Sequence, residues 1–374
     1  MSEKLSILDQ NSLIEFFEKN KIPKFRIKQI YKNIFSNSIL DFDDMTDLSI
    51  ELRNSLKVNF DIIPFELDQM YENEDSCKFG FKLPDGKIIE TVLMLHWHYH
   101  DSKDISTKFL NRLTICISSQ VGCPVGCIFC VTGKLWFGKN LDYANMIWQI
   151  LWVNNYIKTK LGKKEDGTQR KVRNVVFMWM WEPLLNYENV KQSVAYMLWQ
   201  EYLWLGKRHV TISTSGIIKW IDQMIDDNLW VMLALSLHAP NQILREKLIP
   251  TISKIYDLDS LMESVDRYTS KTWNRVFYEY IMIEDMTDKI PLAHQLVDLL
   301  KFRNAHVNLI PYNPNPAMPE LFESKKSQIL AFRDICESGW LTLTVRDNHG
   351  RDIKWACGQL WFEKVNKGEK VSKR

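Results

Sequence analysis

From residue 113 onward, apolar positions repeatedly change their spacing along the chain. Short apolar runs rich in β-branched residues, typical of buried strands, alternate with stretches whose apolar residues recur every three or four positions, which is typical of helices. The predicted strands are residues 113–118, 174–180, 209–214, 231–237, 275–283, 306–310 and 341–345. The predicted helices are residues 141–156, 190–202, 217–226, 256–268, 290–302 and 324–337.

This alternation predicts an α/β fold. Repeated strand–helix units form parallel sheets with right-handed crossovers, and six or so units favour a partial (β/α)6 barrel over a closed eight-stranded one. Ligands of such sheets gather at the carboxyl ends of the strands. The polar residues that end or follow predicted strands are Glu182, Ser213, Ser236, His238 and Asn313. His238 alone would more often be structural, but its place among other strand-end residues favours a binding role.

The first 60 residues predict a small helical module. Its apolar residues at helical spacing are Ile27, Ile30, Tyr31, Ile34 and Phe35, and a second helix is predicted at residues 48–58. Residues 61–105 predict a short β region, with a hairpin at residues 71–95 that turns at Pro84-Asp85-Gly86.

Two features of this β region leave alternatives open. Glu90 in the second arm of the hairpin is either an outward-facing strand residue or a positioned base, and the alternation favours the first. His96, His98 and His100 have the spacing that places side chains on one face of a strand, where they could bind a metal ion. We expect a polar loop at these histidines.

Composition narrows the class of protein. A chain of 374 residues exceeds the size at which one core stops growing, so one large domain with smaller appendages is expected. No apolar run has the length of a membrane span and no signal-peptide region begins the chain. We therefore expect a soluble, cytoplasmic protein that does not contact membranes. Separately, we expect a monomer. Seven cysteines, clustered and odd in number, fit reduced thiols with metal-binding or catalytic roles.

The net charge of +2 conceals two basic stretches. The first holds Lys19, Lys21, Lys24, Arg26, Lys28 and Lys32, and the second holds Lys158, Lys160, Lys163, Lys164, Arg170, Lys171 and Arg173. Such stretches favour a polyanion such as nucleic acid. Each stretch taken alone also fits an ordinary solvated surface.

Residues 116–130, CISSQVGCPVGCIFC, carry the strongest chemical signal. Cys123, Cys127 and Cys130 follow a C-x3-C-x2-C spacing that lets one loop place three thiolates around a compact inorganic centre. Zinc and ordinary iron–sulfur sites use four protein ligands, and no fourth cysteine or histidine lies at loop distance. An iron–sulfur cluster with three cysteine ligands leaves one iron free to chelate S-adenosylmethionine (SAM) for radical chemistry. A disulfide pair, or a zinc ion with a distant fourth ligand, remains an alternative.

Further motifs lie along nearly the whole chain: RIKQIYKNIF, IETV, NVVFM followed by EPLLNYENV, VTISTSG, LALSLHAPN, NLIPYNP and ACGQL. With CISSQVGC and its cluster cysteines, they make the chain resemble the radical SAM RNA methyltransferases of the RlmN/Cfr type, which methylate adenine in RNA. EPLLN and STSG are similar to the RlmN branch, which methylates C2, rather than the Cfr branch, which acts on C8.

The resemblance implies roles for individual residues. Cys123, Cys127 and Cys130 would hold a [4Fe-4S] cluster whose open iron binds SAM, two of which are used per turnover. The implied contacts to the rest of SAM are Trp181, Glu182, Ser213, Ser236, Leu237, His238 and Asn313. Cys357 would carry the methyl group, Cys116 would resolve the intermediate, and Glu90 would be the general base, against the interpretation from alternation.

The resemblance also implies partners and a domain division. The RNA partners would be 23S rRNA and tRNA, and an external electron donor of flavodoxin type would reduce the cluster. Residues 1–60 would form an RNA-binding domain, residues 61–105 a β adaptor, residues 106–350 the barrel, and residues 351–374 the segment with Cys357.

Tryptophans depart from the family pattern. The family has GMGEP where this chain has Trp179-Met180-Trp181-Glu182-Pro183, and Trp136, Trp148, Trp204 and Trp340 also replace expected glycines. Average usage would give about 26 glycines, whereas this chain has 14 glycines and 14 tryptophans. We hypothesise that UGA codons that encode glycine were read as tryptophan. The alternative is a diverged, inactive RNA-binding relative.

Overall fold

The structure, a computed structural model, describes residues 4–99, 108–134, 137–180, 182–315 and 317–346. Its centre is a ten-stranded sheet in the order β14-β13-β12-β11-β10-β9-β6-β5-β4-β3. From β6 to β14 neighbouring strands pair in parallel. These strands are β6 (Lys108–Ser118), β9 (Asn174–Met180), β10 (Val210–Thr214), β11 (Met232–Ser236), β12 (Val276–Met282), β13 (Ala305–Pro311) and β14 (Leu343–Val345).

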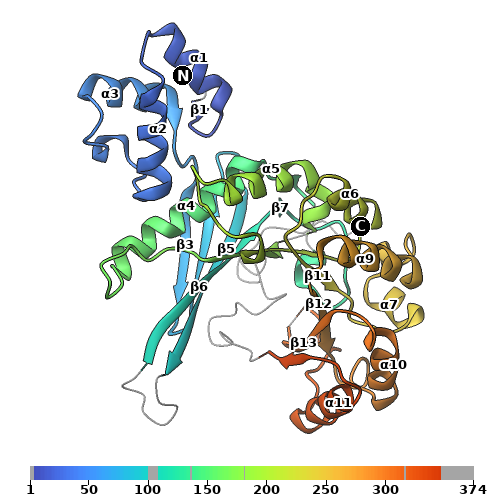
Figure 1. Ribbon diagram of the computed structural model, residues 1–374. Helices are drawn as coiled ribbons and strands as arrows, with labels where there is room; N and C mark the ends of the chain where they lie inside the picture. Colours follow the sequence, from blue (N-terminus) through green and yellow to red (C-terminus); the bar gives the residue numbers. More distant parts are fainter. Residues whose placement is uncertain (1–3, 100–107, 135–136, 181, 316, 347–374) are drawn as a thin grey trace.

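Helices connect the parallel strands and cover the outer side of the sheet, as Figure 1 shows for the helices around β11, β12 and β13. The connecting helices are α4 (Tyr143–Lys160), α5 (Tyr187–Leu198), α6 (Ile218–Asp226), α9 (Leu258–Thr272), α10 (Ile290–Leu300) and α11 (Lys326–Ser338). The predicted strand–helix alternation and partial barrel are confirmed. Two short helices, α7 (Gln242–Leu248) and α8 (Pro250–Ser253), were not predicted.

Helix α9 illustrates how the local sequence builds these elements. The Asp257 side chain accepts a hydrogen bond from Ser260 N and caps the first turn. The buried residues Leu258, Leu261, Met262, Val265 and Tyr268 recur every three or four positions and form one apolar face. Burial of this face against the sheet stabilises the helix more than its intrinsic propensity does.

Three antiparallel strands extend the same sheet beyond β6: β5 (Ile88–Tyr99), β4 (Ser76–Lys82) and β3 (Glu66–Glu72). The predicted hairpin is therefore confirmed. The predicted polar loop is wrong at His96 and His98, because β5 continues through both. His96 Nε2 lies 3.0 Å from Thr114 Oγ1 on β6. His100 lies outside the described residues, and the domain division at residue 105 stays a prediction.

The N-terminal module comprises α1 (Gln10–Lys19), α2 (Phe25–Tyr31), a π-helical turn (Lys32–Ser36), α3 (Ile50–Asn59) and the paired short strands β1 (Leu5–Ser6) and β2 (Phe60–Asp61). As predicted, Ile30, Tyr31, Ile34 and Phe35 are buried, while Ile27 is half-buried. Figure 1 shows the module at one end of the molecule, next to α4.

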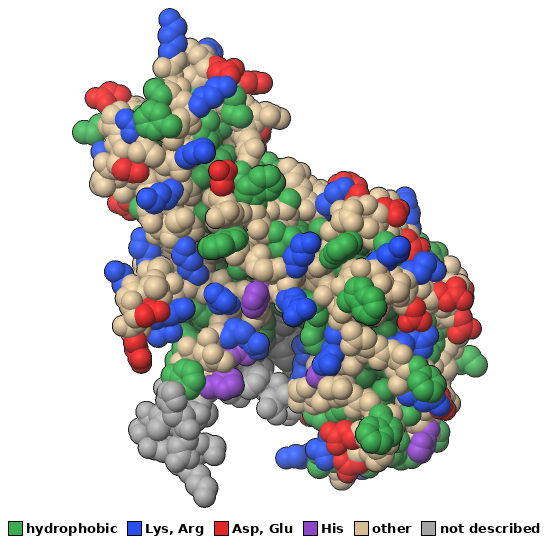
Figure 2. All heavy atoms as spheres, in the orientation of Figure 1, with side chains coloured by type: hydrophobic (Ala, Val, Ile, Leu, Met, Phe, Trp, Pro, Cys, Tyr) green, Lys and Arg blue, Asp and Glu red, His purple; other side chains and the backbone are tan. Residues whose placement is uncertain are grey.

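Two lysines of the second basic stretch bind this module to the sheet domain. Lys171 Nζ donates to Phe35 O (3.1 Å) and Ser36 O (2.7 Å), and Lys158 Nζ donates to Asn37 O (2.9 Å). Ammonium groups suit carbonyls at a helix C-terminus. The exposed basic residues of this stretch are Lys160, Lys163, Lys164 and Arg173. Figure 2 shows Lys and Arg side chains between the module and the barrel. In the described part of the chain, no helix is long and apolar enough to cross a membrane.

Candidate functional site

The cysteine loop follows β6 and is closed by the short strands β7 (Gln120–Val121) and β8 (Lys139–Asn140), which pair antiparallel. Gly126 adopts the left-handed φ of 70° that favours glycine. A Cβ on Gly133 would lie 3.0 Å from Cys127 N, so any other residue there would force the neighbouring loop backbone to shift. Ile128 N donates to Leu248 O (3.0 Å), which fastens the loop to α7.

The loop thiols lie in an environment that favours their neutral form. Burial raises the pKa of Cys123 to about 12, and neighbouring Cys130 and Glu182 add to the rise. Burial also raises the pKa of Cys127 well above its ordinary value, again with Cys130 and Cys123 contributing. A bound cation would reverse this preference, because thiolates are the metal-binding form of cysteine.

The three loop residues supply thiols, the donor type that iron–sulfur clusters use. Among the described residues, no three His, Cys, Asp or Glu side chains are placed to share one metal ion. In an iron–sulfur cluster each cysteine binds a different iron, so the three sulfurs need not meet at a point. No disulfide joins two of the described cysteines. The donor set therefore fits an iron–sulfur cluster.

Glu182 joins the ends of two strands beside this loop. It follows β9 and begins the 3-10 turn Pro183–Asn186. Its Oε1 accepts from Leu184 N (3.1 Å), and its Oε2 accepts from Ser215 N and Ser215 Oγ (2.6 Å each), just after β10. Burial raises the pKa of this carboxyl, while the bonds from Ser215 oppose the rise.

His238 lies against the cysteine loop. Its backbone is left-handed, with φ of 57°, and its ring meets the Phe129 ring edge-on at 4.8 Å between centroids. Its Nδ1 accepts from Ile281 N (3.2 Å), which leaves the proton on Nε2. Burial lowers the pKa of His238 to about 3, and Arg245 adds to the effect. The ring is therefore neutral at cellular pH.

This burial predicts a pH dependence of folding. An unfolded histidine titrates near 6.5 and the folded one near 3, so the unfolded state binds more protons as pH falls between these values. Stability is fully present above pH 6.5 and falls by roughly 2 kcal/mol by pH 5. His238→Asn, which tolerates the left-handed backbone, should lose most of this dependence in urea unfolding. If the free energy of unfolding changes equally with pH in both proteins below pH 6.5, the prediction is contradicted.

The remaining strand-end residues line the same edge of the sheet. Ser213 lies one residue before the end of β10 and is buried, and Ser236 closes β11, where it pairs in register with Glu279 of β12. Leu237 is fully buried, and its N–H donates to Glu279 O (3.1 Å). Asn313 follows β13, and its buried Nδ2 has no hydrogen-bond partner among the described residues. A buried donor of this kind is suited to a ligand.

Glu90 and Cys116 share one face of the sheet. Val92 pairs with Cys116 across β5 and β6, so Glu90, two residues from Val92, lies on the same face as Cys116. Cys116 is buried with Val92 in a small cluster apart from the main core. The expectation from alternation that Glu90 faces outward is wrong: its side chain is buried, 3.7 Å from Lys78 Nζ. Both faces of β5 are covered at residues 89–93, so alternation could not identify an exposed face there.

Three positions singled out from the sequence, Trp136, Trp181 and Cys357, lie outside the described residues. Conversely, the structure adds Arg245 of α7 and Glu279 of β12, which are both buried at the site. Sequence reasoning missed them because an isolated charged residue in a short apolar segment has no spacing signal.

Tryptophans occupy backbone that suits glycine. Three of the eight described non-glycine residues with positive φ are Trp204 (48°), Trp273 (56°) and Trp340 (65°). Their side chains are 70%, 86% and 92% exposed, so packing does not explain them. Trp148 is buried in α4, and its Nε1 has no hydrogen-bond partner among the described residues. The left-handed backbone at Trp204 and Trp340 agrees with the glycine hypothesis, and Trp273 joins them, whereas Trp148 lies in helical backbone that does not require glycine.

A stability experiment checks these environments. We expect a gain of about 2 kcal/mol in the free energy of unfolding for the triple variant Trp204→Gly, Trp273→Gly, Trp340→Gly. Relief of the strain of left-handed backbone outweighs the added conformational entropy of glycine in the unfolded chain. Trp199→Gly is the matched control, since Trp199 is also exposed but has φ of −71°. In thermal unfolding, the melting temperature should rise for the triple variant and should not rise for the control. A fall for the triple variant would refute the assignment.

Known proteins match this chain over nearly its whole length. The family profile described as "Ribosomal RNA large subunit methyltransferase N-terminal domain" matches residues 4–62. A relative from Enterococcus faecalis, "Probable dual-specificity RNA methyltransferase RlmN", is 35% identical over 367 residues, covering 97% of each chain. A relative of the same name from Thermus thermophilus is 39% identical over 337 residues, covering 90% of this chain and 88% of the relative.

A solved structure is similar as well. The crystal structure of a radical SAM methyltransferase from Sphaerobacter thermophilus has a TM-score of 0.84 and 34% identity to this chain. The match covers 95% of this chain and 97% of that one.

Proposed function

Because the chain belongs to the RlmN family of dual-specificity RNA methyltransferases, a family of the radical SAM class, we propose that it methylates C2 of adenosine in 23S rRNA and tRNA. The observation that carries the proposal is the shared sheet edge. Three loop thiols, the strand-end residues and the buried Glu90–Cys116 face all lie around the carboxyl ends of the parallel strands.

The loop cysteines Cys123, Cys127 and Cys130 would hold a [4Fe-4S] cluster. SAM would lie over the strand ends, with Ser213, Ser236 and Asn313 as polar contacts. The carboxylate of Glu182, already held by Ser215, could accept the SAM amino group with its remaining lone pairs. When bound, the reduced cluster would supply one electron that splits SAM into a hydrogen-abstracting radical.

The chain's own cysteines complete the transfer. Adenine C2 lies between two ring nitrogens and is electron-poor, so it does not attack the methyl group of SAM as a nucleophile. Cys357 would instead accept a methyl group from a first SAM and deliver that carbon to C2 after radical activation with a second. Cys116 Sγ would then attack Cys357 Sγ, forming a disulfide as the bond between Cys357 Sγ and the transferred carbon breaks. The carbon on C2 would take up a proton to become the methyl group, and the unpaired electron left from the radical addition would leave to the bound redox centre. An external reductant would then reduce the disulfide. Glu90 would take the C2 proton.

The N-terminal module would bind the RNA backbone. Lys19, Lys21, Lys24, Lys28 and Lys32 are exposed on it, and phosphate contacts of this kind supply sequence-independent affinity. C2 is accessible only when a base is unstacked, so loops and junctions are the expected targets.

Activity of the sequence as written depends on the Trp179–Trp181 segment. Glycine would let the backbone approach SAM, whereas an indole at residue 181 would be expected to compete with SAM for space. Trp179→Gly, Trp181→Gly should therefore raise SAM affinity at least about tenfold in calorimetry, with Trp199→Gly as the control. UGG codons at both positions, or equal SAM affinity before and after the change, would overturn the glycine proposal.

Mass spectrometry of nucleosides tests the proposed reaction. The glycine-bearing protein is incubated anaerobically with 23S rRNA or tRNA, SAM and a reductant. We expect 2-methyladenosine. 8-Methyladenosine would assign the chain to C8 chemistry, and RNA binding without any methylated product would indicate an inactive relative.

A further inference from the structure

Helix α7 carries a fully buried cation beneath the cysteine loop. Arg245 has no exposed surface. Its Nη1 donates to Ser253 Oγ (2.8 Å), and its Nη2 donates to the carbonyl oxygen of Ser215 and weakly to that of Ser236 (3.5 Å). Its Nε is buried without a partner among the described residues. All of its partners are therefore neutral oxygens.

A buried guanidinium without a counter-anion is unusual. Among the described residues, no carboxylate lies within 4.0 Å of Arg245. Removing a charge from water is unfavourable unless an opposite charge compensates it. Burial lowers the pKa of Arg245 to about 10, while Cys127 and Glu182 act in the opposite direction. The group remains charged at neutral pH, so its compensation must come from this site.

The geometry identifies what Arg245 faces. The cysteine loop is bonded to the end of α7 through Ile128 N and Leu248 O (3.0 Å). A Cβ on Gly126 of the loop would lie 3.8 Å from Thr251 Oγ1 of α8. On the other side, Ser215 accepts from Arg245 through its carbonyl and donates to Glu182 through its N–H and hydroxyl. Arg245 therefore links the loop support to the Glu182 end of the site.

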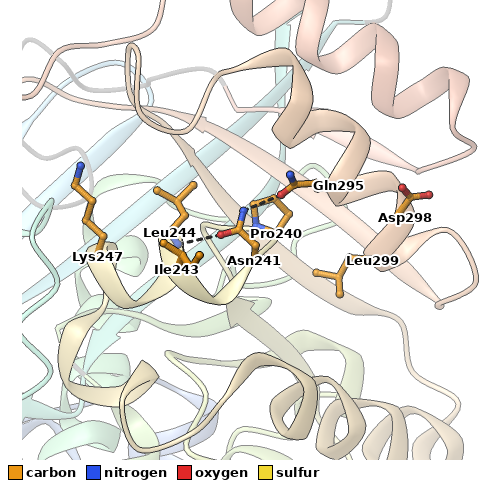
Figure 3. A pocket seen from close by; sticks show the side chains of 8 residues that line it. All are labelled: Pro240, Asn241, Ile243, Leu244, Lys247, Gln295, Asp298 and Leu299. Carbon is orange, nitrogen blue, oxygen red and sulfur yellow. Dashed lines mark hydrogen bonds between the residues drawn. The ribbon is translucent and has the colours of Figure 1, made fainter.

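The opposite face of α7 is solvent-facing and provides a control. Figure 3 shows Ile243, Leu244 and Lys247 on that face, around a surface hollow of about 730 Å³. Lys247 is exposed, two residues from Arg245. Two cations thus lie on one short helix, one buried toward the cysteine loop and one in water.

We propose that Arg245 is a positioning residue that acts as the buried counter-cation of the thiolate cluster and favours its reduced form. This role rests on the proposed function. Three thiolates make the loaded loop anionic, and one electron from an external donor adds one further negative charge. A fixed cation in a water-poor site stabilises the added charge more than a solvated one does.

The first test measures the cluster's midpoint potential by anaerobic spectroelectrochemistry in reconstituted full-length protein. Arg245→Gln should shift the oxidised-to-reduced ratio at least tenfold toward oxidised, which is about 59 mV for one electron. Arg245→Lys should recover most of the shift, and Lys247→Gln should match the unchanged protein. Equal potentials for Arg245→Gln and the unchanged protein would overturn the proposal.

A second pair of variants covers the case in which Arg245→Gln does not fold. Ser253→Asp places a carboxylate beside Arg245 Nη1, whereas Ser253→Asn is the neutral match. Ser253→Asp should lower the potential relative to Ser253→Asn, and equal values would reject the role. If the unchanged protein gains no visible cluster absorbance on reconstitution, the proposed function fails. That failure cannot be attributed to Arg245, because Arg245 is intact in the unchanged protein.

Discussion

Cys116→Ala is expected to trap RNA on the protein. Without the Cys116 thiol, nothing attacks Cys357 Sγ, so the carbon joined to adenine C2 stays bonded to Cys357. Turnover should fall at least about a thousandfold, and a ribonuclease-sensitive protein–RNA adduct should appear on denaturing gels. The hydrophobic residues packed with Cys116 are Val92, Met94, Val176 and Met178, so an alanine methyl suits the site.

Matched variants separate chemistry from folding. Cys357→Ala should abolish both product and adduct, and the double variant with Cys116→Ala should also form no adduct. Cys77→Ala and Cys336→Ala change buried cysteines elsewhere, one on β4 and one in α11. Both controls should retain methylation. If Cys116→Ala turns over at the unchanged rate, Cys116 does not resolve the intermediate.

Cys127→Ala should remove the cluster and with it all methylation. The three loop cysteines would each bind a different iron, and loss of one leaves two ligands on a loop that is already tightly closed at Gly133. Reconstituted protein should lose its visible absorbance and most of its bound iron, while SAM-dependent product falls below detection. Cys336→Ala, which is fully buried in α11, is the control for loss of a thiol.

The metal content of Cys127→Ala also tests the alternative site. If the unchanged protein is colourless and carries one zinc ion, the loop is a structural zinc site. Retention of a full iron complement by Cys127→Ala would show that Cys127 is not a ligand.

The order of strands and helices was predictable because each element carries its own periodicity. The β9 strand, Asn174–Met180, was predicted with its observed bounds. Helix α7 was missed because seven residues contain too few turns for a periodic signal. Asn241 Oδ1 accepts a hydrogen bond from Leu244 N and caps the first turn. Arg245 and Leu248 bury one side of the helix. The burial of Arg245 and Leu248 cannot be recognised without the surrounding structure.

Glu90 shows the limit of alternation. It lies among apolar residues of β5, and a charged residue in such a strand normally marks a wet face. Here the Glu90 carboxylate lies near Lys78 of β4, and the same face of β5 packs against Cys116 of β6 rather than facing water. The tertiary arrangement, rather than the pattern, buries this carboxylate.

By itself, the sequence determined the cysteine loop, the strand-end residues and the family, because ligands within eight positions and motifs in fixed order are local properties of the chain. Only the tertiary structure decided that Glu90 and Cys116 share a face, since β5 and β6 must pair in register to bring them together. It also decided that Arg245 lies under the loop, and that three tryptophans occupy left-handed backbone. Such facts depend on contacts between distant segments and on dihedral angles, which composition and spacing do not encode.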